Sequence, residues 1–528
     1  MADQLGILLA GFTNLLGLQL ASRLLTFFFN LLIVRRLSPE EYGVAAVQFH
    51  LLTTTILFLS REGFRRGCLR KDGSQEHEDK QPNAESLELQ RVLGICWLPI
   101  PVGIVISTIV CSFLCWSQTG DDSSAYCHAV VLNGVATVIE LCSEPMYIIA
   151  HLWLRFDLRL AVEGTATLVK MISVLLLLDF TLVNRATIFA YSQVAFAVVS
   201  LIGYGTLAPR IFKEAGDSLT LKTMLTFDPG MMSLSLIFSF QAVVKHFLAE
   251  GSKFVLVSVE SWYHQGVYGL VNNLGSLVVR LLFQPLEESA FTAFSRSGVS
   301  RSDKQGMGRL VKLLAALVRG VSLIGTMAIT FGPSYSKLFL RIVYSTKWST
   351  TEAPTVLALY CGYIPLLAIN GITEAFTHAV LDVKGLGWSN VFMIAVTLVH
   401  VAISVAFVRT WGSCGLVLAD GLNMAMRIAY SFRCIGGYFR GVPSFSWTSF
   451  VPRMATLLGA LAAAFVAEAS RHVIFDLRLL SSFAQQACVH IAVGAACAAA
   501  LVGLMYFSER QVWTDLLALK RSGEKKED

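Results

Sequence analysis

The stretch that decides the fold is the first one, LGILLAGFTNLLGLQLASRLLTFFFNLLIV at residues 5–34, in which Arg23 is the only ionisable side chain. A helix needs about 20 apolar residues to cross the roughly 30 Å of hydrocarbon in a bilayer. Arg23 lies about 16 Å from the far end of this stretch, at about 1.5 Å per helical residue. A cation at that depth is expected to face a polar cavity or a charged partner, and it marks a functional site.

Further apolar stretches follow along the chain. Counting the first, we place fourteen of them, the last ending near residue 506. Of the 528 residues, 55% are hydrophobic and 15% are charged, whereas a soluble chain carries about 25% charged residues. The sequence therefore predicts an all-α polytopic membrane protein with about 14 transmembrane helices. Its modest net charge of +6 indicates no nucleic-acid partner.

The loop charges predict the orientation. With a cytosolic N-terminus, the cytosolic loops and tail hold 24 of the 42 Lys and Arg residues, and the opposite loops hold 10. Because positive charge is retained on the cytosolic side, both termini are expected there. The largest cytosolic loop, about residues 61–91, begins with the basic segment REGFRRGCLRK at 61–71 and continues with a polar, acidic segment at 72–88.

A two-fold pattern runs through the spans. A shift of 222 positions brings Arg23 onto Lys245, and Glu144 has a rough counterpart in Glu374. Transporters commonly bind substrate at the interface of such repeats, so we expect two pseudo-symmetric six-helix bundles and two added helices. The expected parts are an N-terminal bundle at 1–208, a cytosolic linker at 209–226, a C-terminal bundle at 227–436, two additional transmembrane helices at 437–506 and a cytosolic tail at 507–528.

Three cations are candidates for lining a central cavity, namely Arg23, Lys245 and Arg280. Charge-assisted hydrogen bonds to phosphate oxygens are strong, so two cations converging from the two halves would suit a phosphate or a pyrophosphate. The alternative is that each cation neutralises a carboxylate, such as Glu140 or Glu144, and so lets the bundle pack.

The basic cluster after the second span also has two interpretations. One is that Arg61, Arg65 and Arg66 ring the cytosolic mouth and attract a polyanionic headgroup. The other is that they are a positive-inside stop in contact with anionic lipid.

Several acidic residues are expected to act in gating, as proton carriers or as countercharges. They are Glu62, Glu140, Glu144, Glu287, Glu288, Glu374 and Asp420. The eleven cysteines show no zinc-like spacing, and the chain has no G-x-x-x-x-G-K-[ST] sequence, so neither a metal, a cofactor nor ATP hydrolysis is expected. Lys525 and Lys526, fourth and third from the end, resemble the dilysine signal that returns membrane proteins to the endoplasmic reticulum.

Five segments carry a resemblance to known proteins. RRLSPEEYG at 35–43 is similar to the first loop of the multidrug/oligosaccharidyl-lipid/polysaccharide (MOP) exporter superfamily. FLSREGFRRGCL at 58–69, SEPMYIIA at 143–150, RLLFQPLEES at 280–289 and NGITEAF at 370–376 resemble the eukaryotic Rft family within it. Arg155 and Arg159 stand where that family often has lysine.

The resemblance implies a place and a role. Rft proteins reside in the endoplasmic reticulum membrane and are needed for N-glycosylation. They have been assigned the flipping of a mannose-rich oligosaccharide linked to dolichyl pyrophosphate from the cytosolic to the lumenal leaflet. The implied partners are that glycolipid, membrane lipid and other proteins of the glycosylation pathway.

Other functions stay open at this point. One is a non-transporting accessory factor of the lipid-linked oligosaccharide pathway, and another is a cation-coupled small-molecule exporter of the same fold. The exporter would favour acidic and aromatic cavity residues over Arg23 and Lys245. A membrane-embedded glycosyltransferase is disfavoured because the first lumenal loop, about residues 35–42, offers only Glu40 and Glu41 as acids. No enzymatic activity is therefore expected.

The charge asymmetry makes a testable prediction about topology. In sealed microsomes, a protease added outside should remove an epitope placed after Asp528 and should cut within residues 72–88. An epitope that is protected until detergent opens the vesicles would place the C-terminus in the lumen and contradict the orientation.

Overall fold

The computed structural model describes residues 25–69, 91–117, 123–153, 155–181, 183–209, 227–296, 303–477, 481–510, 512 and 514. Over these ranges the chain forms helices and no β-strand. The predicted all-α class is therefore confirmed. Arg23, Lys525 and Lys526 lie outside the described residues, as do most of the loop at 61–91 and of the linker at 209–226.

Twelve helical segments within the described ranges are long and apolar enough to cross a membrane. One of them, Lys384–Tyr438, is interrupted at Gly412, where φ is 54° and ψ is −134°. Such a left-handed conformation is readily adopted only by glycine, and it divides this segment into the two spans that the sequence predicts. A shorter apolar helix at Leu25–Val34 is the described end of the predicted first span. With these two additions the segments match the predicted fourteen.

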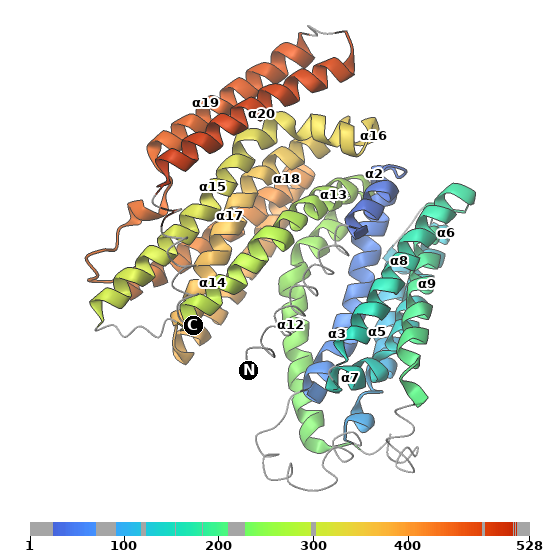
Figure 1. Cartoon of the computed structure of the whole chain (residues 1–528). Coiled ribbons are helices and arrows are strands. Elements are labelled where there is room, and N and C mark those ends of the chain that lie inside the picture. Colours follow the sequence, from blue (N-terminus) through green and yellow to red (C-terminus); the bar gives the residue numbers. More distant parts are fainter. Residues whose placement is uncertain are drawn as a thin grey trace, which may run out of the picture. The chain divides into compact units, whose positions relative to one another are not determined.

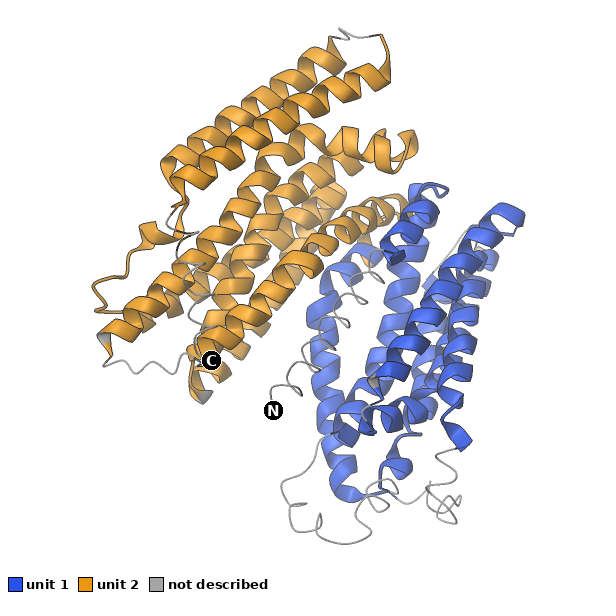
Figure 2. Cartoon of the chain, viewed as in Figure 1, with its two compact units in different colours: residues 1–257 blue, residues 258–528 orange. Residues whose placement is uncertain are grey.

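The chain divides into two compact units, residues 1–257 and residues 258–528 (Figure 2). In this division most of the helix at Pro229–Val259 groups with the first unit. The linker predicted at 209–226, between the two six-helix bundles, stays a prediction.

Unit 1 is a bundle of long helices (Figure 1). Its helix α2 has a capping box that pairs Ser38 with Glu41 and places Pro39 in the first turn, as helix starts prefer. Its elements are α2 (Pro39–Gly43), the π-helical turn η1 (Val44–Phe49), α3 (His50–Leu69), α5 (Pro99–Ser117), α6 (Ser123–Leu141), α7 (Glu144–Leu152), α8 (Phe156–Phe180), α9 (Arg185–Gly205) and most of α12 (Pro229–Val259).

Unit 2 is built around the long helix α15 and its neighbour α17, with two further helices packed along α15 (Figure 1). Its elements are α13 (Trp262–Val278), the π-helical turn η4 (Val279–Phe283), α14 (Gln284–Arg296), α15 (Lys304–Val343), α16 (Thr346–Ser349), α17 (Ala353–Val380), α18 (Val383–Tyr438), the short 3-10 helix η5 (Trp447–Phe450), α19 (Met454–Arg471), the π-helical turn η6 (His472–Asp476) and α20 (Phe483–Ser508).

Polar contacts fasten the last two helices to α15. The Ser334 hydroxyl donates to Glu468 of α19 at 2.8 Å, and the Tyr335 hydroxyl donates to the backbone carbonyl of His490 in α20 at 2.8 Å. The Tyr335 and His490 rings stack with centroids 4.1 Å apart. Nearer the middle of α15, Arg319 lies 3.4 Å from the fully buried Glu509. These contacts hold the added helices within unit 2.

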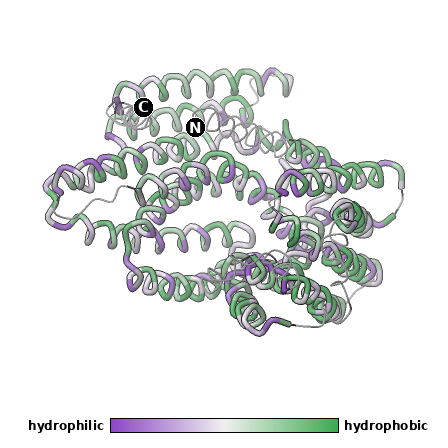
Figure 3. The backbone as a smooth tube through the Cα atoms, turned by 60° about the horizontal axis from the view of Figure 1, so that its bottom comes forward, coloured by the Kyte–Doolittle hydropathy of each residue, from purple (hydrophilic) through white to green (hydrophobic). Residues whose placement is uncertain are grey.

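Hydropathy follows the expectation for a bundle surrounded by lipid. Hydrophobic residues run along most of the helices, and hydrophilic residues gather at many helix ends (Figure 3). Large apolar side chains such as Trp116, Phe180 and Phe507 are exposed on the bundle surface. A soluble protein rarely exposes so many such groups, whereas lipid accommodates them.

Close packing of α3 on α12 makes a prediction for Gly63. A Cβ added there would collide with the backbone of Ser239, while one added at Gly164 in α8 would meet nothing. Overpacking typically costs about 1–3 kcal/mol, so Gly63→Ala should lower the thermal unfolding temperature of the purified protein. Gly164→Ala is the matched control and should leave stability unchanged or raise it, because alanine is the better helix former by about 1 kcal/mol. Equal unfolding temperatures for the two variants would contradict the packing.

Candidate functional site

The most buried charge pair in unit 1 joins α3 to α7. Arg65 donates through Nε and Nη2 to the two carboxylate oxygens of Glu144, the second bond being 2.8 Å long. The Glu144 side chain is 1% exposed and that of Arg65 is 17% exposed. A two-pronged bond of this kind is the strong, geometrically specific form of an arginine–carboxylate pair.

A second arginine extends this pair to α6. Arg61 lies one turn before Arg65 on α3 and donates to Glu140 at 2.9 Å, with Glu144 at 3.9 Å. Glu140 and Glu144 flank the break between α6 and α7, where the Ser143 hydroxyl donates to the Glu140 carbonyl at 2.7 Å. The i,i+4 spacing on both sides therefore places two cations opposite two anions. We call these four residues the Arg–Glu network.

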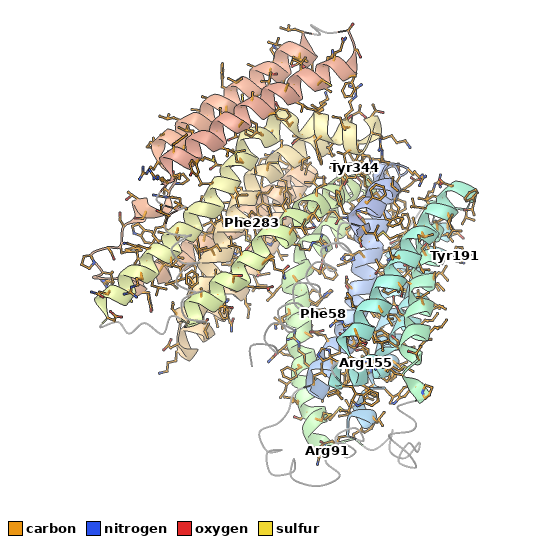
Figure 4. The ribbon with its side chains drawn as sticks, viewed as in Figure 1. Phe58, Arg91, Arg155, Tyr191, Phe283 and Tyr344 are labelled. Atoms are coloured by element: carbon orange, nitrogen blue, oxygen red, sulfur yellow. The ribbon has the colours of Figure 1, made fainter. Side chains whose placement is uncertain are left out.

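Aromatic and basic side chains border the Arg–Glu network. The Arg65 guanidinium stacks 3.7 Å from the Tyr147 ring centroid, and that of Arg159 lies 5.2 Å from it. A small pocket beside them is lined by Tyr147, Ala150, His151, Arg155 and Arg159. Figure 4 shows Arg155 close to the end of unit 1 where α7 lies. Guanidinium groups over an aromatic face form cation–π contacts.

Arg66 differs from its neighbours. It pairs with Glu62 on the same helix at 2.7 Å, and its side chain is 40% exposed. Of the three arginines predicted to attract a headgroup, Arg66 is thus on the surface, while Arg61 and Arg65 have internal carboxylate partners.

Unit 2 holds an analogous pair on other helices. Glu374 of α17 accepts both short bonds from Nη2 of Arg427 in α18, at 2.9 and 2.7 Å, and a third from Asn370 at 2.8 Å. Glu287 of α14 packs against Gly371, the residue after Asn370, so closely that a Cβ there would collide with its carboxylate. Glu288 accepts a bond from Gln284 at 3.2 Å and lies on the exposed side of α14.

A buried polar cluster surrounds Asp420 in the same unit. The Tyr268 hydroxyl of α13 donates to one carboxylate oxygen at 2.9 Å, and Nε2 of His400 lies 3.0 Å from the other. Ser404, one turn after His400, lies 3.1 Å from the same ring nitrogen. Asp420 is therefore satisfied by groups from α13 and from the part of α18 before Gly412.

Two of the three predicted cavity cations, Lys245 and Arg280, lie on the surface of their units. Lys245 is exposed near the middle of α12, one turn from the exposed Gln241, and makes no ion pair with any described residue. Arg280 is exposed on η4 and donates to the Ser276 carbonyl at 3.0 Å and to its hydroxyl at 2.6 Å. Neither is brought together with the Arg–Glu network by a described contact.

Sequence reasoning did not single out Arg427, His400 or Tyr147. Arg427 carried the same signal as Arg23, a lone cation within an apolar span. His400 and Tyr147 have no such signal in the sequence. Histidine and tyrosine are both found in membrane helices, and the roles of these two residues are shown only by the side chains that they contact.

The model for the Rft protein family matches residues 8–519, which is nearly the whole chain. The chain belongs to the Rft family.

Full-length relatives support this membership. The proteins from Dictyostelium discoideum, Xenopus tropicalis and Mus musculus are 29%, 30% and 29% identical to this Rft chain. The alignments cover 97%, 94% and 94% of it and 96%, 93% and 93% of the relatives. Each of these relatives is named Man(5)GlcNAc(2)-PP-dolichol translocation protein RFT1.

Solved structures show the fold to which this Rft chain is similar. The lipid II flippase MurJ in an inward closed conformation matches with a TM-score of 0.64 at 13% identity, covering 93% of this chain and 98% of MurJ. An inward-facing MATE family multidrug resistance transporter of the MOP superfamily matches with a TM-score of 0.55 at 12% identity, covering 79% and 96%. The Rft chain therefore has a MOP-type fold, and the proteins that it resembles are translocation proteins and transporters.

The Arg–Glu network makes a prediction for Glu144. Glu144→Gln leaves Arg65 buried without its anion, and breaking a buried pair in this way costs about 3–5 kcal/mol. Abundance and thermal stability should both fall sharply, and the double change Arg65→Gln with Glu144→Gln should recover most of the loss.

Glu62→Gln is the matched control, because its partner Arg66 is exposed and a surface pair is worth about 0–1 kcal/mol. A Glu144→Gln protein that is as stable as the Glu62→Gln protein would show that the Arg–Glu network does not stabilise the fold.

Proposed function

We propose that this Rft chain translocates a mannose-rich oligosaccharide linked to dolichyl pyrophosphate from the cytosolic to the lumenal leaflet of the endoplasmic reticulum membrane, where it serves protein N-glycosylation. The observation that carries the proposal is similarity over nearly the full length to relatives named for translocating such a glycolipid. The fold shared with a lipid flippase supports the transport step. Both termini face the cytosol in this proposal.

Lys245 and Arg23 are the residues that we assign to the headgroup. A lysine near the middle of a 31-residue apolar helix is costly unless it faces a polar cavity or a charged partner. Because Lys245 pairs with no described carboxylate, a substrate pyrophosphate would supply the missing negative charge. Arg23 is placed at the equivalent position of the first half by the repeat, and Arg280 is a third candidate at the end of its span.

The Arg–Glu network has a different part in this proposal. Arg61 and Arg65 already hold Glu140 and Glu144, so a pyrophosphate can reach them only by displacing a carboxylate. Such an exchange would loosen α3 from α6 and α7, which makes the network a gate at the cytosolic end. Arg66, exposed beside it, would attract the headgroup. In unit 2 we assign countercharge or gating roles to Glu374, with Glu287 and Glu288 nearby, and to Asp420.

Alternating access supplies the mechanism of the proposed step. Transporters built from repeats expose a mid-membrane site to one side and then to the other by rocking one half against the other. The sugar headgroup would cross in the hydrated site while the polyprenyl chain stays in lipid. Too dense a cluster of cations would hold the pyrophosphate and block release, so one cation from each half suits repeated turnover.

The proposal is tested with purified protein in liposomes. Vesicles with the wild-type chain should move the pyrophosphate-linked mannose-rich oligosaccharide between leaflets, and vesicles without protein should not. A pyrophosphate-linked short sugar is the control for selectivity. Normal binding without any translocation would contradict a flippase and favour the non-transporting accessory role.

Variants of Arg23 sharpen this test. Arg23→Ala should abolish translocation while the protein accumulates normally, and Arg23→Lys should be partly active, because the charge remains but the two-pronged fork is lost. If Arg23 only balances a buried acid, then Arg23→Ala will lower abundance, and neutralising that acid will restore both abundance and transport. That rescue would disprove the headgroup role.

A further inference from the structure

Two cysteines face each other where α5 ends and α6 begins. The Cys115 thiol donates to the backbone carbonyl of Cys127 at 3.9 Å, and the Cys127 thiol donates to the carbonyl of Cys115 at 3.8 Å. This reciprocal arrangement places one thiol opposite the other across the helix interface.

Small residues bring α5 and α6 close enough for this contact. One turn before Cys115, the Cys111 thiol donates to the Val130 carbonyl of α6 at 3.6 Å. A Cβ at Gly134 would collide with Cys111 and Ser107, so the helices nearly touch along this line. A disulfide requires Cα atoms about 4.4–6.8 Å apart, which only closely packed helices provide.

The proposed orientation puts this contact on the lumenal side. With a cytosolic N-terminus, α5 runs towards the lumen and α6 returns from it, so the turn between them faces the oxidising compartment. Trp116, 83% exposed next to Cys115, has the character of an aromatic residue at the membrane interface. Disulfides form and persist in the lumen of the endoplasmic reticulum and are rare in the cytosol.

We propose that Cys115 and Cys127 form a disulfide bond in the mature protein. The inference rests on the proposed orientation and residence, and not on the transport activity itself. The bond closes a short loop and ties the third span to the fourth at the lumenal end, opposite the Arg–Glu network. The disulfide thus holds α5 to α6 at one end of unit 1, while the Arg–Glu network holds α3 to α6 and α7 at the other.

The oxidant is the disulfide of a thiol–disulfide oxidoreductase. One cysteine thiolate attacks that disulfide and forms a mixed disulfide, and the second cysteine displaces the oxidoreductase. Cys115 and Cys127 together lose two electrons and two protons, and the oxidoreductase takes them up as two thiols. The balance is therefore closed without any other reactant.

Two further cysteines, at the opposite end of unit 1 from Cys115 and Cys127, provide an internal control. Cys68, in the last turn of α3, and Cys96 belong to one buried cluster. The orientation puts them on the cytosolic side, so they should remain thiols. A compartment effect thus predicts one oxidised pair and one reduced pair in the same molecule.

The experiment alkylates the full-length protein in denaturant directly from membranes, before and after reduction, and maps the modified cysteines by mass spectrometry. Cys115 and Cys127 should be alkylated only after reduction, while Cys68, Cys96 and Cys111 should be alkylated without it. In Cys115→Ser, Cys127 should become alkylated without reduction. Alkylation of Cys115 and Cys127 in unreduced wild-type protein would overturn the proposal.

A second arm separates geometry from compartment. Purified, reduced protein is treated with oxidised glutathione, a small disulfide that can transfer its bond to a suitably placed pair. Formation of the bond only in this arm would show that the geometry is right and the lumenal placement wrong. Formation in neither arm would show that the two thiols cannot meet. Translocation in liposomes is measured separately, so a protein that carries the bond but does not transport would count against the proposed function alone.

Discussion

The pairing of Arg65 with Glu144 is the interaction on which unit 1 depends. A guanidinium and a carboxylate inside a low-dielectric bundle are each costly alone, and together they are tolerated only with good geometry and further hydrogen bonds. Arg65 meets both conditions by its two-pronged bond to Glu144 and its stacking on Tyr147. Arg61 and Glu140 extend the same balance to α6. Three helices are thereby joined at one end by charge rather than by apolar packing alone.

The second half of the chain also pairs an acid within an apolar span with an arginine, but the arginine comes from a different helix. The acid is again on the fourth helix of the half, Glu374 in place of Glu144, but its arginine comes from α18 and not from the helix equivalent to α3. At that position α14 carries Glu287 and Glu288. The acid thus lies on the corresponding span of both halves, whereas its arginine lies on a different helix in each. In both halves this acid has an arginine partner.

The membrane class and the number of spans could be predicted from the sequence because hydropathy acts locally. Glu374 was also predictable as an acid within an apolar span and a rough counterpart of Glu144. The pairing of Glu374 with Arg427 was not predictable. A charge within an apolar span indicates that a partner is needed, but it does not identify the partner residue. The sequence likewise places Arg65 in a basic cluster after the second span and Lys245 within the seventh, without indicating a partner for either. Only the folded chain shows that Arg65 has a carboxylate and that Lys245 has none among the described residues.

We propose that Lys245 is left for the substrate's pyrophosphate, because the buried arginines already balance the chain's own acids. The most direct measurement compares the affinity of the purified protein for dolichyl pyrophosphate and for uncharged dolichol, in the wild type, Lys245→Met and Lys245→Arg. We expect the wild type and Lys245→Arg to prefer the pyrophosphate by about tenfold or more, which is about 1.4 kcal/mol, and Lys245→Met to lose most of this preference. An unchanged preference in Lys245→Met would contradict this role of Lys245.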